Sequence, residues 1–252
     1  MSDRSRPTAV DSQLRYRGLR IAMRVQGDGE PLLLINGVTR PLASWEPFTR
    51  ELTGRTVVTF DVPGVGGSSS PLLPRSIPAL ADIAVAVLAA AGHARADVLG
   101  FSHGGAVAQQ LAATKPGSVR RLVLAATSCG VGAQPGNSRA VMRGLAASGG
   151  DRSWSGADLL GLLRQSIGFS WWSSIPLLGA ISAPTLVVTG RHDRVVPPAN
   201  SRILAARIRG AKLVMLTAGH DLQQSGPAAA LARVVEDHLS AGHAGERLST
   251  SA

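Results

Sequence analysis

A serine that could act as a nucleophile lies in the segment Gly100-Phe101-Ser102-His103-Gly104, which has the form G-x-S-x-G. An apolar run precedes this segment and an alanine-rich stretch follows it. The motif in that context predicts a sharp strand-to-helix turn that exposes the serine hydroxyl above the end of a sheet. Side chains at positions 100 and 104 would collide with neighbouring backbone in such a turn, so both positions favour glycine. The segment therefore predicts Ser102 as the nucleophile of a serine hydrolase.

A serine hydroxyl is a poor nucleophile until a base takes its proton, so a histidine is required. His220 is the best placed of the six histidines, because it follows the apolar run 213–216 directly. The end of that run is expected at the carboxyl edge of the sheet, where ligands bind in open α/β sheets. The other five histidines lie in the turn of the serine, beside a candidate acid, or away from this edge. The position predicts His220 as the general base.

An acid that orients the histidine is also expected at the end of a strand. Asp193 follows the apolar run 186–189, and the chain order Ser…Asp…His is the one that α/β hydrolases use. Asp221 is the competitor, but a residue adjacent to the histidine rarely reaches its ring. The sequence predicts that Asp193 holds the imidazole tautomer and stabilises its charged form.

Two backbone N–H groups are needed to stabilise the oxyanion of an acyl-transfer reaction. The N–H of His103, at the start of the predicted helix, supplies one of them. The turn after the apolar run 32–35 supplies the other, and Val38 is the expected donor, with Gly37 letting the backbone approach closely.

The elements that would position these residues alternate along the chain. Short apolar runs that suit strands covered on both faces lie at 32–35, 56–60, 97–101, 122–124, 185–188 and 213–216. Helical patterns lie between them at 77–91, 103–114, 199–208 and 226–239. A pair of extended segments, broken near Gly18, leads at 15–26. This alternation predicts an α/β fold with a doubly wound, mostly parallel sheet.

One stretch interrupts the alternation, because residues 129–183 contain no buried-strand pattern. We expect them to form a short cap inserted into a core of residues 14–128 and 184–240, with flexible tails at 1–13 and 241–252. A cap over the nucleophile would supply part of the substrate pocket. The candidate substrate-binding residues are Thr39, Cys129, Trp171, Trp172 and Leu177. For Cys129 the alternative is a small buried hydrophobe, and of the two tryptophans one is expected in buried packing and the other on the pocket wall.

Composition limits the function classes. The formal net charge is +10, but the basic residues, almost all arginine, are scattered without a run suited to nucleic acid. The charge leaves open either genomic coding bias or attraction to an anionic surface or substrate. No segment has the length of a membrane span or the pattern of a signal peptide, and there is one cysteine, so a cytoplasmic location is expected. No metal-binding or nucleotide-binding motif is present, and no cofactor is expected.

Three segments add a family resemblance: LLLINGV (32–38), FDVPGVGGSSSP (60–71) and LGFSHGGAVAQQLA (99–112). Together with the residues above, they resemble the α/β-hydrolase family over about 15–240, and within it the intracellular poly(3-hydroxyalkanoate) depolymerases and related esterases. The resemblance implies a hydrolase of aliphatic 3-hydroxyacid esters, small or oligomeric, with Ser102, Asp193 and His220 as the catalytic residues. It also implies that Asp61 and Gly64 belong to a structural turn.

The favoured function is therefore cleavage of carboxylic esters through an acyl-enzyme. The same three residues also suit a carbon–carbon bond hydrolase or a cofactor-free perhydrolase. A homologue that binds a ligand without turning it over is the alternative outside enzymes. The acyl chain length, a polymeric substrate and the oligomeric state stay open at this level.

Overall fold

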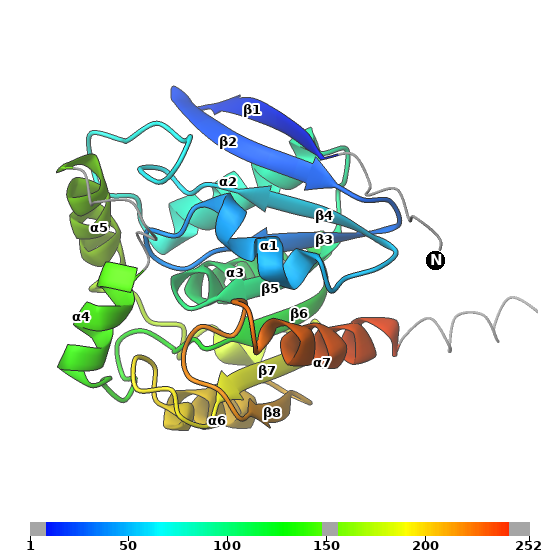
Figure 1. Cartoon of the computed structure of the whole chain (residues 1–252), viewed down its shortest axis with the longest axis vertical. Coiled ribbons are helices and arrows are strands. Elements are labelled where there is room, and N and C mark those ends of the chain that lie inside the picture. The colour runs from blue at the N-terminus through cyan, green and yellow to red at the C-terminus, as the bar shows by residue number, and fades with distance from the viewer. Residues whose placement is uncertain (1–8, 148–155, 242–252) are drawn as a thin grey trace, which may run out of the picture.

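The computed structural model describes residues 9–147 and 156–241. Its centre is an eight-stranded sheet (Figure 1). The strands are β1 Val10–Tyr16, β2 Leu19–Gln26, β3 Glu30–Ile35, β4 Arg55–Phe60, β5 Ala96–Phe101, β6 Val119–Ala125, β7 Thr185–Gly190 and β8 Lys212–Leu216. Their spatial order is β1-β2-β4-β3-β5-β6-β7-β8. The pairs β1–β2 and β2–β4 are antiparallel and all other pairs are parallel, so the expected mostly parallel sheet is present.

Helices connect the parallel strands. The α-helices are α1 Glu46–Thr49, α2 Ile77–Ala90, α3 His103–Thr114, α4 Ser138–Ala147, α5 Gly156–Phe169, α6 Pro198–Arg207 and α7 Ala228–Ser240, with single 3-10 turns η1 Leu42–Trp45, η2 Pro116–Ser118 and η3 Leu178–Ala180. Within the described residues, none of the helices combines the length and the apolar character that crossing a bilayer requires.

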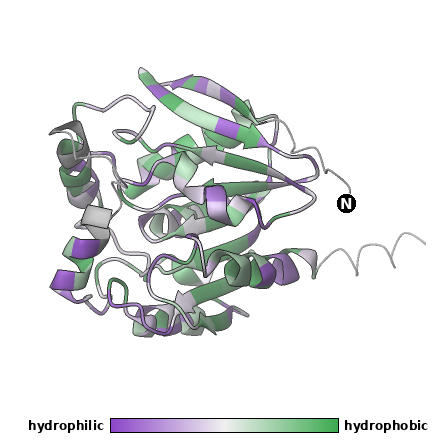
Figure 2. Cartoon of the chain, viewed as in Figure 1, coloured by the Kyte–Doolittle hydropathy of each residue, from purple (hydrophilic) through white to green (hydrophobic). Residues whose placement is uncertain are grey.

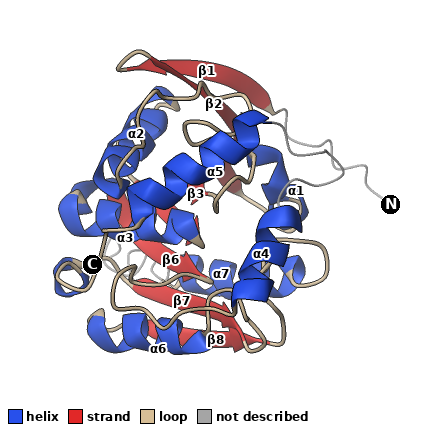
Figure 3. Cartoon of the chain, turned by 90° about the vertical axis from the view of Figure 1, so that its left-hand side faces the viewer, coloured by secondary structure: helices blue, strands red, loops and turns tan. Residues whose placement is uncertain are grey.

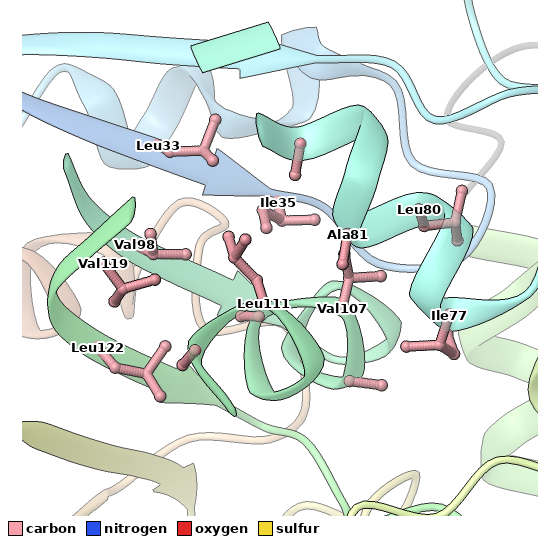
Figure 4. Close-up of a cluster of buried hydrophobic side chains, with 14 of the residues drawn as sticks. Leu33, Ile35, Ile77, Leu80, Ala81, Val98, Val107, Leu111, Val119 and Leu122 are labelled. Atoms are coloured by element: carbon pink, nitrogen blue, oxygen red, sulfur yellow. The ribbon is translucent and has the colours of Figure 1, made fainter. Parts of the chain in front are cut away.

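Two hydrophobic cores, one on each face of the sheet, hold the helices in place. Successive residues of a strand point to opposite faces, so Leu33 and Ile35 enter one core while Leu32 and Leu34 enter the other. Figure 4 shows the first core, where strand residues meet the apolar sides of α2 and α3. The second core packs against α1 and α7. Figure 2 shows the central strands as the most hydrophobic part of the chain, which matches strands covered on both faces.

The hairpin of β1 and β2 begins earlier in the chain than the predicted end of the N-terminal tail at residue 13. Residues 10–13 were expected in a flexible tail, but they form the start of β1 and pair with residues 22–25 of β2. The turn between the strands has positive φ at both Arg17 and Gly18 (46° and 78°), the conformation that suits the twist of a tight hairpin. Residues 10–13 are all exposed and only Val10 among them is apolar, which is why the sequence did not indicate a strand there. The remaining tail positions, 1–8 and 242–252, lie outside the described residues.

Helices α4 and α5 lie in the stretch between β6 and β7 and cover the carboxyl edge of the sheet (Figures 1 and 3). An isolated bridge pairs Gly130 with Ser173 at the base of this segment, antiparallel. The backbone of α5 comes very close to the loop before α2: a Cβ atom at Gly161 would lie 2.6 Å from the carbonyl oxygen of Gly64, and one at Gly168 would lie 2.2 Å from that of Arg75. Two glycines seven residues apart thus allow the helix to seat against this loop.

Candidate active site

Ser102 lies in a strained turn between β5 and α3. Its φ is 52° and its ψ is −118°, a conformation that non-glycine residues rarely adopt and that costs about 1–3 kcal/mol. The flanking glycines make the turn possible: a Cβ at Gly100 would lie 2.4 Å from the carbonyl oxygen of Gly104, and one at Gly104 would lie 2.1 Å from that of Ile35. The steric requirement expected for positions 100 and 104 is therefore confirmed. Thr127 Oγ1 donates to the Ser102 carbonyl oxygen at 2.7 Å and holds the turn from the side of β6.

The structure brings the three predicted catalytic side chains together. His220 Nε2 lies 3.1 Å from Ser102 Oγ, and His220 Nδ1 lies 2.8 Å from Asp193 Oδ2. Separations of 118 and 27 residues along the chain are closed because β5, β7 and β8 end at the same edge of the sheet. With the Nδ1–H donating to the carboxylate, Nε2 is free to accept the hydroxyl proton.

Both oxygens of the Asp193 carboxylate have hydrogen-bond partners. It is buried, and its Oδ1 accepts the backbone N–H groups of Val195 and Val196, each at 2.8 Å, while Oδ2 faces His220. Asp221, the competing acid, points elsewhere: its Oδ1 accepts from Arg40 Nη2 at 2.5 Å. The two carboxylates expected near the histidine thus have different partners: Asp193 faces His220, and Asp221 faces Arg40.

The two predicted oxyanion donors come from the turn after β3 and from the start of α3. His103 begins α3, where the first N–H groups of a helix have no partner within the helix. Val38 lies in the turn after β3 and lines the cavity at Ser102 together with Gly37. In the part of the chain that the structure describes, neither of these two N–H groups donates to an internal acceptor. Arg40 N–H donates to the Gly37 carbonyl oxygen at 3.3 Å and closes the turn.

Arg40 is a residue of this site that the sequence analysis missed. Its side chain is buried, lines the cavity and bonds to Asp221, beside His220 in the chain. Its guanidinium carbon lies 5.7 Å from the centre of the Phe101 ring, whose centre is 5.1 Å from that of His220. Burial lowers the pKa of Arg40, and the Asp221 carboxylate opposes that shift. The sequence feature that could have indicated Arg40 is a charged residue in the turn after β3, the first parallel strand.

The His103 ring is buried. The ring centre lies 5.8 Å from that of Phe169, at the end of α5, and Nδ1 has no hydrogen-bond partner among the described residues. Burial lowers the pKa of His103 to about 4, so the imidazole is neutral at pH 7.

A cavity of about 360 Å³ opens at Ser102 and His220. Its walls come from the turn after β3, the segment after β6, α4 and α5, and the loop before α6. The other lining residues are Gly37, Val38, Arg40, Ser128, Gly130, Ala133, Gln134, Pro135, Gly136, Val141, Phe169, Val195, Val196 and Asn200. Most of this wall is small or apolar, which suits an aliphatic group of modest size.

None of the five predicted substrate-binding residues is among the residues that line this cavity. Trp171 is 92% exposed on the outer side of the molecule, whereas Trp172 is buried and donates from Nε1 to Gln110 Oε1 at 2.9 Å. Cys129 lies in the core between two cavity residues, and burial raises the pKa of its thiol.

Thr39 and Leu177, the remaining two, are also absent from the cavity lining. Thr39 has a positive φ of 59°, and its N–H donates to Gln165 Oε1 of α5 at 3.4 Å. Leu177 is half-buried just before η3. Size and position along the chain do not reveal which way a side chain points, and this is why the predicted residues differ from those that line the cavity.

Asp61 holds the turn after β4, as the resemblance implied. Its carboxylate accepts the N–H groups of Leu42 at 2.6 Å and Gly67 at 2.8 Å. Burial raises the pKa of Asp61, and the two backbone hydrogen bonds oppose that shift. No group of three or more metal-ligating side chains occurs among the residues that the structure describes.

Comparisons with known proteins agree with this fold and site. The family model of the alpha/beta hydrolase fold matches residues 30–147, and that of the TAP-like proteins matches residues 174–250. A poly(3-hydroxyalkanoate) depolymerase of Ectopseudomonas oleovorans is 34% identical over 220 residues, which cover 75% of this chain and 77% of the depolymerase. A 2-hydroxymuconate semialdehyde hydrolase of Pseudomonas putida is 30% identical over 268 residues, which cover 91% and 94% of the two chains.

A solved structure extends the agreement to three dimensions. A hydrolase from Pseudomonas aeruginosa PA01 superposes with a TM-score of 0.78 at 28% identity, over 91% of this chain and 98% of that one. Since the family model, relatives aligned over most of their length and a solved hydrolase structure all point the same way, the chain belongs to the α/β-hydrolase fold family and is a hydrolase.

Proposed function

We propose that this hydrolase cleaves carboxylic esters through an acyl-enzyme formed on Ser102. The observation that carries the proposal is the position of His220, whose two ring nitrogens lie within hydrogen-bond distance of Ser102 Oγ and the buried Asp193 carboxylate. A base between a hydroxyl and an orienting acid is the arrangement that activates a serine.

In the proposed reaction, Ser102 Oγ attacks the ester carbonyl carbon while His220 Nε2 takes the hydroxyl proton. The tetrahedral oxyanion accepts hydrogen bonds from the N–H groups of Val38 and His103. Its collapse breaks the ester bond, and the imidazolium returns the proton to the leaving alcohol. Water then attacks the acyl-enzyme with His220 again as base, and the carboxylic acid leaves. Asp193 stabilises the imidazolium in both halves without being protonated.

The proposed substrates are aliphatic 3-hydroxyacid esters, either small or oligomeric. The relative named as a poly(3-hydroxyalkanoate) depolymerase supports this class, and so does the apolar wall formed by Val141, Phe169, Val195 and Val196. We also propose that residues 129–183 act as a short cap on a core of residues 14–128 and 184–240. Two described parts of that segment, α4 and α5, contribute Val141 and Phe169 to the cavity, which supports this division.

A second candidate function is hydrolysis of a carbon–carbon bond. It is favoured by one specific observation: the 2-hydroxymuconate semialdehyde hydrolase is similar over almost its whole length. The ester proposal is preferred because the depolymerase is the more similar in sequence over a comparably large region.

The first test replaces the nucleophile. Ser102→Ala is expected to lower turnover of p-nitrophenyl butyrate by about 10⁶-fold, because loss of a triad member removes covalent catalysis. Ser128→Ala, which removes another hydroxyl from the same cavity, is expected to lower turnover by less than tenfold. Retention of activity by the Ser102 variant within tenfold of wild type would show that the nucleophile has been misassigned.

The same enzyme preparation separates the substrate classes. Steady-state rates are measured on p-nitrophenyl esters of two to twelve carbons, on 3-hydroxybutyrate oligomers and on 2-hydroxymuconate semialdehyde. We expect kcat/KM on the oligomers to exceed that on the semialdehyde by at least 100-fold. The reverse order would favour the carbon–carbon hydrolase, and no turnover of any of them would favour a binding protein.

A further inference from the structure

The outer side of α5 carries large apolar side chains that no described part of the chain covers. Leu160, Leu163 and Ile167 are 43%, 55% and 49% exposed. Their spacing of three and four residues places them on one stripe of the helix. Trp171, two residues beyond the end of α5, is 92% exposed. Isolated exposed apolar residues are ordinary, but a continuous stripe of them marks an interaction surface.

The loop before α2 extends this surface. Leu72 and Leu73 are 92% and 75% exposed, and they lie beside α5 because Arg164 Nη1 donates to Ser70 Oγ at 2.6 Å. We refer to these two leucines, the three apolar residues of α5 and Trp171 together as the cap face. The opposite side of α5 is buried, where Gln165 contacts the turn of Val38 and Thr39. The helix therefore has one side facing the site and one apolar side facing out.

Positive charge predominates around the cap face. The segments 64–76, 138–147 and 160–171 contain no Asp or Glu, and Asp158, in the first turn of α5, is the one acidic residue of α4 and α5. The three segments contain four arginines, Arg75, Arg139, Arg143 and Arg164, and the whole chain has a formal net charge of +10. Arg139 and Arg143 are exposed on α4, on either side of Met142, which is itself 67% exposed. This pattern of apolar residues flanked by cations complements a surface that is apolar inside and anionic outside.

The position of the cap face relates it to the site. In Figure 3, α4 and α5 lie across the side of the molecule turned toward the viewer, over the carboxyl edge of the sheet. Phe169, the last residue of α5, lines the cavity at Ser102. A surface bound by the cap face would therefore lie next to the cavity and not on the far side of the sheet.

We propose that the cap face docks the protein on an anionic phospholipid surface. The apolar side chains of α5, with Trp171 and the two leucines, enter the interfacial layer, while the arginines of α4 contact the lipid phosphates. The charge disfavours a second copy of this chain as the occupant, because pairing two cap faces would bring the arginines of both copies together. Docking needs no turnover, so it can be tested separately from the proposed ester hydrolysis.

The test measures co-sedimentation with vesicles, using the full chain with Ser102→Ala so that lipid is not hydrolysed. The vesicles contain either phosphatidylcholine alone or phosphatidylcholine with about 30% phosphatidylglycerol. The second lipid gives the vesicle a negatively charged surface. We expect at least tenfold tighter binding to the anionic vesicles, weakened by salt. On binding, the Trp171 fluorescence shifts to the blue, and this shift is lost in Trp171→Phe.

Paired variants test both parts of the face. Leu163→Ser with Ile167→Ser, and separately Arg139→Gln with Arg143→Gln, should each weaken binding to anionic vesicles at least tenfold. Val10→Ser, at an exposed apolar site on β1, and Arg202→Gln with Arg209→Gln, at exposed sites on and just after α6, are the matched controls. The controls should change binding less than twofold. Circular dichroism verifies that every variant is folded.

Four results would overturn the proposal. The first is no binding to anionic vesicles, and the second is binding that the controls weaken as much as the cap-face variants do. The third is a dimer in solution that Leu163→Ser with Ile167→Ser dissociates while vesicle binding is unaffected, which would assign the face to a second copy. Equal, salt-insensitive binding to both vesicle types would likewise contradict an anionic partner.

Discussion

At the scale of single residues, the two carboxylates near His220 have different partners. Asp193 faces the Nδ1 atom and accepts two backbone N–H groups, whereas Asp221 pairs with Arg40 and is 40% exposed. An acid that holds a histidine tautomer cannot be replaced by an amide, because the amide offers a donor where an acceptor is required. The acid paired with Arg40 has no such requirement.

Asp193→Asn should therefore lower kcat on p-nitrophenyl butyrate by about 10⁴-fold. Asp221→Asn should lower it by less than about tenfold, because the remaining amide oxygen still accepts from Arg40. The check is kcat measured for both variants at saturating substrate. If the two variants exchange their effects, the orienting acid is Asp221.

The neutral His103 ring makes folding stability depend on pH. Its pKa is lowered from 6.5 to about 4 by burial, so the unfolded chain binds a proton in this range that the folded chain does not. Stability from this group is complete above pH 6.5 and is lost as the pH falls toward 4, by about 3 kcal/mol in total. His103→Met, of similar size, should remove this part of the loss.

Urea unfolding of wild type and of His103→Met at pH 7 and pH 4.5 measures the difference. We expect the stability gap between the two pH values to be about 2–3 kcal/mol smaller in the variant. An equal gap in the two proteins would show that the imidazole is protonated in the folded state.

At the scale of elements, α5 and the turn after it present different side chains toward the cavity and toward solvent, and these should have separable effects. Phe169 lines the cavity and its ring packs against those of His103 and Trp172, whereas Trp171 points outward. Removing the inner ring adds space where an acyl chain would extend, and each buried methylene of substrate is worth about 0.8 kcal/mol. Removing the outer ring changes no wall of the cavity.

Phe169→Ala should accordingly raise the ratio of kcat/KM for octanoyl over butyryl nitrophenyl esters by more than threefold. Trp171→Ala should leave this ratio within threefold of wild type. Both ratios come from initial rates in buffer without vesicles. A shift caused by Trp171→Ala and not by Phe169→Ala would mean that Trp171, and not Phe169, contacts the acyl chain.

At the scale of the whole molecule, the carboxyl and amino edges of the sheet have different roles. The carboxyl edge carries the site, while the amino edge carries a buried ionic network. Asp97, at the start of β5, is fully buried and accepts from Arg55 Nη1 at 3.1 Å and from Arg120 Nη2 at 2.7 Å. Arg55 also pairs with Glu236 of α7 at 2.8 Å. Asp97 and Ser102 are five positions apart in the chain, which corresponds to about 16 Å of strand.

Asp97→Ala should destabilise the fold by about 3–5 kcal/mol, because it removes the buried carboxylate that the Arg55 and Arg120 guanidinium groups share. The matched control is Asp11→Ala, which removes the partner of Arg24 from an exposed pair and should cost less than about 1 kcal/mol. Urea unfolding measures both. The folded fraction of the Asp97 variant should keep its kcat within about twofold of wild type. A large loss of kcat would mean that the amino edge communicates with the site.

Local patterns in the sequence were sufficient for the elements and for the residues at their ends. Continuous apolar runs identified the six parallel strands because strands covered on both faces contain little else, and glycines at 100 and 104 identified the turn of Ser102. The parallel strands then bring Asp193 and His220 to Ser102, because their carboxyl ends meet at one edge.

What only the tertiary structure decided is the direction of side chains in the irregular segments. Trp171 and Trp172 are neighbours of the same type, yet one is exposed and the other is buried against Gln110. Arg40 enters the site wall through a turn whose shape no periodic pattern encodes. In a helix or a strand, the repeat of the backbone determines where each side chain points. In a loop, that direction depends on which distant segment packs against it, and only the folded chain specifies this contact.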